Sequence, residues 1–223
     1  DEPGGHPDFQ GYGWIRGITP GIVMPDLGAD QKPVYNGTGP IVGSMNRQQT
    51  TGPEAFNQWY RNTPCAGQNV VTCPPGQDSV NLYTEFVIPI QAVPGQLATY
   101  DNAAFFPIDN QLFGNYSTYN HNFHFTTELH TTFLYSGGEI FRFTGDDDLW
   151  VFINGKLAID LGGIHSSASQ QVDLDARAVE FGITIGTEYP LDLFHAERHT
   201  TESHFRIDTS IGFTNCAPII ILY

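Results

Sequence analysis

An alternation of apolar and polar side chains runs through the middle of the chain, from Phe123 to Tyr135. The Phe residues, Leu129 and Tyr135 occupy odd positions, whereas the His and Glu residues occupy even ones. Successive side chains of an extended strand point to opposite faces, so this period of two predicts a long strand with one face buried. Such a strand belongs to a sheet that covers a hydrophobic core. A chain of 223 residues suffices for one large β domain or two small ones.

Other segments carry strand and turn signals of the same kind. Ser136-Gly137-Gly138 indicates a turn, and Asn154-Gly155 between two apolar runs predicts a tight hairpin. No amphipathic helix is expected in the second half of the chain, and Pro53 is expected to be the first residue of a short helix in the loop-rich first half. The sequence predicts that helix at 53–60 and strands at 12–18, 82–90, 123–135, 139–144, 149–153, 156–161, 179–185, 189–195 and 204–213.

The chain shows neither an internal repeat nor a low-complexity linker, which favours a single domain over residues 1–223. Within it, residues 1–11 are expected to be flexible and residues 215–223 to begin a linker or a following segment. No run of about 18 apolar residues is present, and no signal peptide precedes Asp1, so we expect a mature or trimmed piece of a larger protein that does not insert into a membrane.

The net charge of the chain disfavours some classes of binding partner. The chain has 24 Asp and Glu against 9 Lys and Arg, a formal net charge of -15. Such a field repels phosphate backbones and anionic lipids, so nucleic acid and membrane surfaces are poor partners. The excess of carboxylates is typical of a solvated surface, and it also suits a protein that meets cations outside the cell.

Three cysteines give a partial covalent framework. Cys65 and Cys73 lie close together in a loop-like stretch and are predicted to form a disulfide, whereas Cys216 has no assigned partner. Their spacing is not that of a zinc site. Glycosylation sequons at Asn36 and Asn115 favour a secreted or cell-surface location only weakly.

The run Asp146-Asp147-Asp148 follows Gly145 and precedes the apolar stretch 149–153. Adjacent carboxylates repel one another, and their oxygens suit a hard cation such as Ca²⁺. Neighbouring side chains of a strand point apart, however, so two of them converge on one ion only at a turn, a bulge or an unusual peptide bond. An exposed acidic turn without bound metal is the alternative interpretation.

A second cluster of polar residues occupies positions 194–204, between two predicted strands. It contains three histidines together with Glu197, Arg198 and Glu202. Loops on a rigid scaffold often carry function, although solvated surface charges would look the same.

Three long strings connect these clusters to a known family: GDDDLWVFINGK at 145–156, DLGGIH at 160–165 and LDLFHAERH at 191–199. They resemble the fibro-slime branch of the PA14 domain superfamily, and the resemblance extends upstream through 6–9, 56–60, 105–107 and 121–126. It implies an all-β fold, a two-sheet antiparallel β-sandwich with loop-rich N-terminal excursions. It also implies an extracellular protein related to adhesins and glycan-active proteins.

In lectin-like members of the superfamily, two neighbouring Asp residues joined by a cis peptide bind one Ca²⁺. The resemblance places this pair at Asp146 and Asp147. It places a side-chain ligand at Glu197, where flocculins carry Asn, and backbone carbonyl ligands at His199 and Thr201.

Sugar hydroxyls are expected to complete the coordination of the ion, with Asp146 and Asp147 accepting hydrogen bonds from them. Asp148 and Arg198 are predicted to contact the ligand at the rim of the site.

The expected function is therefore a secreted, Ca²⁺-dependent carbohydrate-binding module, a lectin or adhesin that recognises cell-surface or matrix glycans and is not an enzyme. The main alternative is a structural or signalling module of the extracellular matrix whose Ca²⁺ only makes loops rigid. A glycosidase built on Asp146, Asp147 and Glu197 is disfavoured because adjacent acids do not normally straddle a glycosidic bond. A transition-metal site of His121, His124, His195 and His199 is disfavoured because strand neighbours of this spacing face apart.

Overall fold

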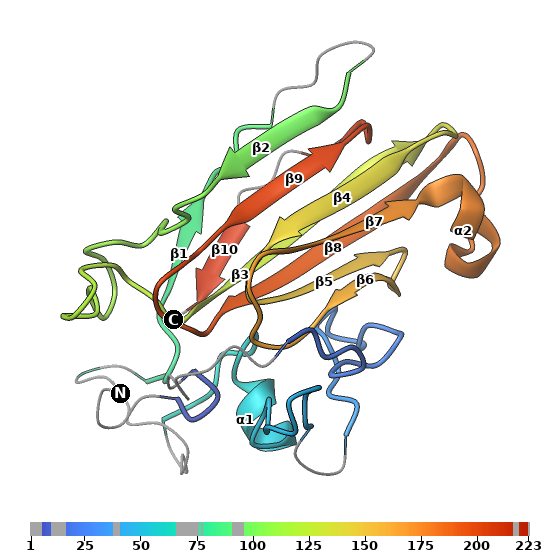
Figure 1. Cartoon of the computed structure of the whole chain (residues 1–223). Helices are drawn as coiled ribbons and strands as arrows, with labels where there is room; N and C mark the ends of the chain where they lie inside the picture. Colours follow the sequence, from blue (N-terminus) through green and yellow to red (C-terminus); the bar gives the residue numbers. More distant parts are fainter. Residues whose placement is uncertain are drawn as a thin grey trace.

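The computed structural model describes residues 6–9, 17–37, 41–65, 76, 78–90, 96–215 and 219–222. Two antiparallel sheets lie face to face over this part of the chain, one of six strands and one of four (Figure 1). The predicted all-β sandwich is therefore confirmed. None of the helices among the described residues is long and apolar enough to span a bilayer.

The chain crosses repeatedly from one sheet to the other, as the strand order of each sheet shows. The larger sheet has the order β1 (Tyr83–Phe86), β10 (Ile219–Leu222), β3 (Phe125–Tyr135), β8 (Thr187–Glu197), β5 (Asp148–Ile153) and β6 (Lys156–Leu161). The smaller sheet has the order β2 (Ala98–Asn102), β9 (Phe205–Thr209), β4 (Ile140–Gly145) and β7 (Ala168–Asp173), and the helices are α1 (Pro53–Asn57) and α2 (Leu174–Phe181).

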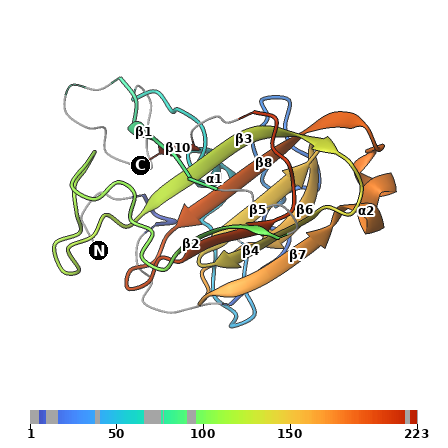
Figure 2. The same ribbon diagram turned by 90° about the horizontal axis from the view of Figure 1, so that it is seen from above.

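The main core lies between the two sheets. Strand β3 and strand β8 pair along their whole length, and their inward side chains meet those of β4 and β9. Figure 2, seen from above, shows the small sheet lying over the large one. The buried side chains include Phe125, Phe133, Phe141, Phe143, Leu149, Val151, Leu191, Leu193, Phe205 and Ile207.

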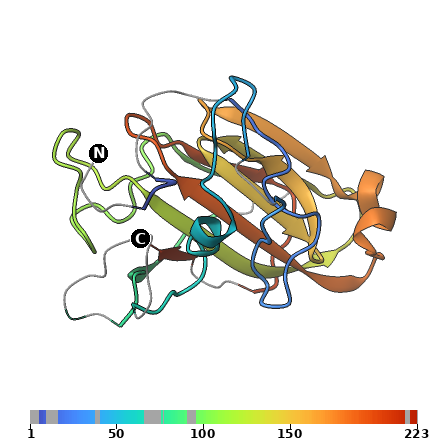
Figure 3. The same cartoon turned by 90° about the horizontal axis from the view of Figure 1, so that it is seen from below.

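Strand β5 is buried on both faces, which explains its unbroken apolar sequence. Leu149 and Val151 belong to the core between the sheets, whereas Trp150 and Phe152 point to the outer face of the large sheet. There they pack against Phe56 and other residues of the described segments between 6 and 60, which we call the N-terminal layer. Figure 3 shows this layer, including α1, lying across the large sheet. The molecule therefore has three layers.

The hairpin at Asn154-Gly155, the helix that starts at Pro53 and the strands of the central region agree with the sequence predictions to within a few residues. The strand predicted at 82–90 is shorter and covers Tyr83–Phe86, whereas most of the strand predicted at 12–18 lies outside the described residues.

The strand predicted at 179–185 is wrong, because the chain forms helix α2 up to Phe181. Asp173 caps its N-terminus by accepting a hydrogen bond from the Ala176 amide at 3.1 Å, and Gly182 ends it in a left-handed conformation. Val179 is 98% exposed, so its apolar side chain does not indicate a buried strand. Strands β2 and β7 were not predicted.

Both ends of the described chain are packed into the domain. Asp8 and Phe9, within the segment predicted to be flexible, are buried. Residues 219–222, within the stretch expected to begin a linker or a following segment, form β10 and pair with both β1 and β3.

Gly145 ends β4 where the chain leaves the small sheet. A methyl group at this position would collide with the carbonyl oxygen of His204 and would lie 2.8 Å from the Phe143 ring. The close approach of β4 and β9 at this point therefore requires glycine.

We expect Gly145→Ala to lower the free energy of unfolding by about 2 kcal/mol or more, because overpacking of a tight contact forces the backbone apart. Urea denaturation measures the loss. Gly212→Ala is the matched control, since a methyl group there meets no atom within 4 Å. Equal stability of the two variants would contradict the proposed packing.

A chain of charged side chains ties the N-terminal layer to the large sheet. Lys32 pairs with Glu128 on β3, Glu128 Oε1 lies 2.8 Å from His130 Nε2, and His130 Nδ1 lies 2.6 Å from Asp192 Oδ1 on β8. Both ring nitrogens face carboxylates, so the geometry requires a protonated ring. Burial alone lowers the pKa of His130, but the hydrogen bonds to Asp192 and Glu128 outweigh it and raise the pKa to about 9.

Because the folded pKa of His130 exceeds its ordinary value of 6.5, the stability it contributes is complete below pH 6.5 and is lost as the pH rises through 9. We expect the free energy of unfolding of the wild type to fall by roughly 2 kcal/mol over this interval relative to His130→Gln. Denaturation curves of both proteins between pH 6 and 10 measure the difference. A constant difference across that range would contradict the assigned protonation.

Candidate functional site

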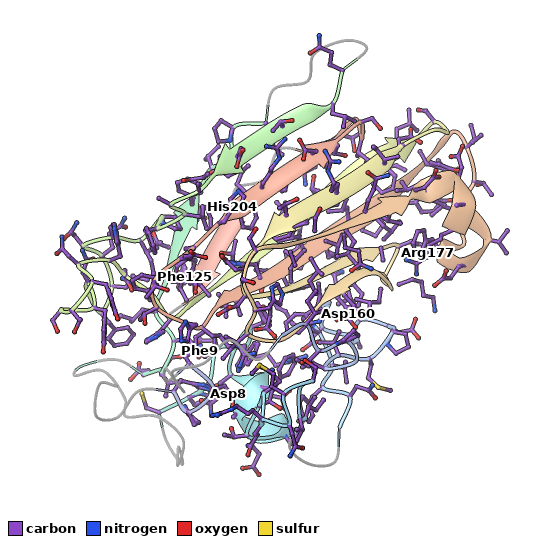
Figure 4. All side chains as sticks on the ribbon, in the orientation of Figure 1. Asp8, Phe9, Phe125, Asp160, Arg177 and His204 are labelled. Atoms are coloured by element: carbon purple, nitrogen blue, oxygen red, sulfur yellow. The ribbon has the colours of Figure 1, made fainter. Side chains whose placement is uncertain are left out.

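Two connections between the sheets lie side by side at one end of the sandwich. Residues 146 and 147 link Gly145 at the end of β4 to Asp148 at the start of β5, and residues 198–204 link β8 to β9. Strand pairing brings them together, because Asp148 faces Ala196 and Gly145 faces Phe205. The acidic run and the polar loop singled out in the sequence are therefore neighbours in space, at the end of β8 and β4 marked by His204 in Figure 4.

The Asp146–Asp147 peptide bond is cis, as the resemblance to lectin-like proteins predicts. Both carboxylates are held by backbone amides of flanking segments. Asp146 Oδ1 accepts from the His204 amide at 2.6 Å, and Asp147 accepts from His165 at 3.1 Å on Oδ1 and from Arg198 at 3.2 Å on Oδ2. Three amides from two segments, the β8–β9 connection and the loop that contains His165, therefore fix the orientation of the pair.

Glu197 is the last residue of β8, and its side chain is buried beside the Asp pair. Its Oε1 accepts from the His199 amide at 3.3 Å, and the Ser203 hydroxyl lowers the pKa of the carboxyl group, but the buried Oε2 has no hydrogen-bond partner. A buried carboxylate oxygen without a donor is costly unless a cation or a proton compensates it.

The three carboxyl groups at the site have raised pKa values, which a nearby positive charge would lower. Burial, and then the charges of Asp147 and Asp146, raise the pKa of Glu197. Burial also raises the pKa of Asp147 well above its ordinary value, although Arg198 opposes this, and burial raises the pKa of Asp146. Like charges in a low-dielectric site disfavour ionisation, and a bound cation would reverse that effect.

The oxygen donors fit Ca²⁺ better than a transition metal, since carboxylates and backbone carbonyls are the ligands of hard cations. His199 and Thr201, the predicted carbonyl ligands, lie in the loop that directly follows Glu197. Within the described part of the chain, no group of three or more His, Cys, Asp or Glu side chains is arranged so that it could hold a metal ion by itself. A cation here would therefore depend on backbone and external oxygens as well as on the carboxylates.

Asp148 and Arg198, predicted to contact a ligand at the rim, are instead fully buried, both with 0% exposure. Arg198 Nε donates to Asp148 Oδ2 at 2.6 Å, and Asp148 Oδ1 accepts from the Gly163 amide at 2.5 Å. The guanidinium lies 4.7 Å from the centre of the Trp59 ring. Side chains without exposed surface do not reach a ligand in solution, so this placement corrects the expectation of direct contact.

Two histidines support the site in ways that sequence reasoning missed. His195 is fully buried, and burial lowers its pKa to about 4, so the ring is neutral and donates from Nε2 to the Asp146 carbonyl at 3.0 Å. His165, in the matched string 160–165, contributes the amide that binds Asp147. The place of His165 in that string was the available signal for a role.

Two of the four histidines of the alternative transition-metal site make contacts with other groups. His121 pairs with Asp109 at 2.7 Å and stacks on Phe106 with ring centroids 3.9 Å apart. His195 Nε2 contacts a carbonyl oxygen rather than another histidine. These contacts do not favour the four-histidine hypothesis.

Cys65 is disulfide-bonded. Its predicted partner Cys73 lies outside the described residues, as does Cys216, so the Cys65–Cys73 pairing stays a prediction.

Relatives of the chain occur among proteins of Dictyostelium discoideum. Protein psiD is 37% identical over 93% of this chain and 39% of its own length, and protein psiQ is 40% identical over 89% of this chain and 19% of its own length. Protein psiR is 40% identical over 95% of this chain and 20% of its own length. The chain thus spans less than two fifths of each of these relatives.

Residues 93–219, more than half of the chain, match the model of the PA14 domain, a family that often binds carbohydrate or mediates adhesion. The match includes both sheet connections at the candidate site. The chain belongs to the PA14 domain family.

Proposed function

We propose that the chain is a Ca²⁺-dependent carbohydrate-binding module of a secreted or cell-surface protein. The observation that carries the proposal is the buried, unpartnered Oε2 of Glu197 beside the carboxylates of Asp146 and Asp147. A net charge of -15 and a bonded cysteine suit an extracellular protein. The fibro-slime branch of the superfamily remains the specific assignment that the motifs favour.

The residues that would hold the ion are Asp146, Asp147 and Glu197 through their side chains, and His199 and Thr201 through backbone carbonyls. When bound, Ca²⁺ supplies a centre that two neighbouring sugar hydroxyls can coordinate. The Asp pair contributes charged acceptors for hydrogen bonds from those hydroxyls, which are stronger than neutral ones. Backbone amides already orient both carboxylates, which reduces the ordering required on binding.

We assign this site to binding rather than to catalysis. The charge of Asp147 raises the pKa of Glu197, so the two carboxylates lie within close electrostatic reach on two neighbouring strand ends. A glycosidase needs two carboxyl groups on opposite sides of a bond. Cell-surface or matrix glycans are therefore the proposed partners.

One observation favours a second function, a structural module in which the ion only makes loops rigid. Asp146, Asp147 and Glu197 are 4%, 3% and 1% exposed, so little of the carboxylate surface faces solvent. In that case the ion would join the two sheet connections without presenting a coordination position to a sugar.

We expect Asp147→Asn to abolish stabilisation by calcium while the fold survives. At a free calcium concentration a hundred times the Kd, the wild type should gain about 2.7 kcal/mol, a rise of roughly 5–10 °C in melting temperature. Asp160→Asn is the control, because Asp160 is a partly buried carboxylate bound to Trp150 and Gly21 outside the site. An unchanged calcium shift in Asp147→Asn would contradict the assigned register.

A glycan array probed with and without a chelator separates the two functions. Sugar binding that disappears on chelation decides for the lectin. Calcium binding without retention of any glycan decides for the structural module, and sugar binding that survives chelation contradicts the proposed role of the ion.

A further inference from the structure

Arg198 is joined to the candidate site through its backbone. Its amide donates to Asp147 Oδ2 at 3.2 Å, and it lies between Glu197 and His199 in the chain. Any shift of Arg198 therefore moves one of the donors that orient Asp147, and it moves Glu197 with it.

The side chain of Arg198 reaches in the opposite direction, into the N-terminal layer. Nη1 donates to the carbonyl oxygens of Asp8 at 3.2 Å and Gln49 at 2.6 Å, and the guanidinium packs over Trp59. Asp8 is itself fixed, because its carboxylate accepts from the Thr51 amide at 2.6 Å and from Trp59 Nε1 at 3.1 Å. The Arg198 side chain thus ends in a rigid, buried setting.

Gln49 provides a second connection from the same layer. Its Oε1 accepts from the Ile164 amide at 3.1 Å, and the next residue, His165, donates its amide to Asp147 Oδ1. The N-terminal layer consequently supports Asp147 from both sides, through Arg198 on Oδ2 and through His165 on Oδ1. Residues 8, 49, 51 and 59 lie outside the segment that matches the PA14 family model.

We infer that Arg198 is a positioning residue, through which the N-terminal layer holds Asp147 and Glu197 in the geometry that a cation requires. The inference rests on the proposed function for the identity of the ion, but the order that Arg198 imposes on the two connections exists without it. Residues that orient metal ligands typically change metal affinity 10- to 100-fold when they are replaced.

A contribution of Arg198 to stability alone can be distinguished from a positioning role. A buried ion pair contributes little net stability, because the cost of desolvating both charges offsets their attraction, and neutral replacement of both partners is often tolerated. Removing the charges of Arg198 and Asp148 together should therefore preserve the fold. What should be lost is the rigid placement of the neighbouring carboxylates.

The test is the double variant Asp148→Asn/Arg198→Met, in which the amide oxygen can still accept from Gly163 and neither replaced residue leaves the other with an unpaired charge. Its control is Arg177→Met/Glu180→Gln. Arg177 likewise donates to two carbonyls, those of Leu157 and Ala158, pairs with a carboxylate and packs over a ring, that of Phe181. Figure 4 shows Arg177 at the end of the sandwich opposite to His204.

Two measurements are made on all three proteins. Without calcium, amide hydrogen exchange of residues 146–148 and 197–204 should be at least tenfold faster in the Arg198 double variant than in the wild type, with similar melting temperatures. By calorimetric titration with calcium, its Kd should be at least tenfold higher. The Arg177 control should match the wild type in both.

Arg198→Lys keeps the inference testable if the double variant does not fold, because it retains the charge that Asp148 needs but lacks the planar fork. It should show the same effects at about threefold or more. Unchanged exchange in the folded variants overturns the positioning role, and faster exchange with an unchanged Kd overturns its relevance to the ion. A wild type that binds no calcium overturns the proposed function, while the exchange arm still decides whether Arg198 orders the connections.

Discussion

Burial of strand β5 on both faces is the constraint on which the rest of the structure depends. Leu149 and Val151 require a second sheet over one face, and Trp150 and Phe152 require a cover over the other. Full burial of such side chains is worth roughly 1.5–3 kcal/mol each, so a two-layer sandwich that exposed Trp150 and Phe152 would lose much of its marginal stability. The N-terminal layer is therefore part of the folded unit.

The same constraint places charge in the interior. Because β5 begins at Asp148 in the middle of three layers, the acidic residues before it are buried along with the strand. Arg198 neutralises Asp148, but in the described part of the chain no ion pair neutralises Asp146, Asp147 or Glu197. Desolvated carboxylates either take up protons or share a cation. Burial of β5 therefore also buries the carboxylates next to it, and the proposed ion would compensate their charge.

Much of the fold was predictable because its strongest signals are local. The alternation in β3, the apolar run of β5 and the Asn154-Gly155 turn each reflect the environment of a few adjacent residues. Helix α2 was missed because its spaced apolar residues also match a strand, while the cap at Asp173 decides for the helix. Strand β7 was missed because an exposed edge of alternating polar residues carries no apolar pattern.

The candidate site divides in the same way. Asp146, Asp147 and Glu197 could be found from motifs because each stands at a strand end inside a recognisable string, and pairing of β5 with β8 brings the strings together. The burial of Arg198 could not, since a charged residue in a polar loop looks solvated. Its carbonyl partners lie 149 and 190 residues away in sequence. The candidate ligand residues can therefore be predicted from local sequence, whereas the orientation of their side chains depends on contacts that only the folded chain creates.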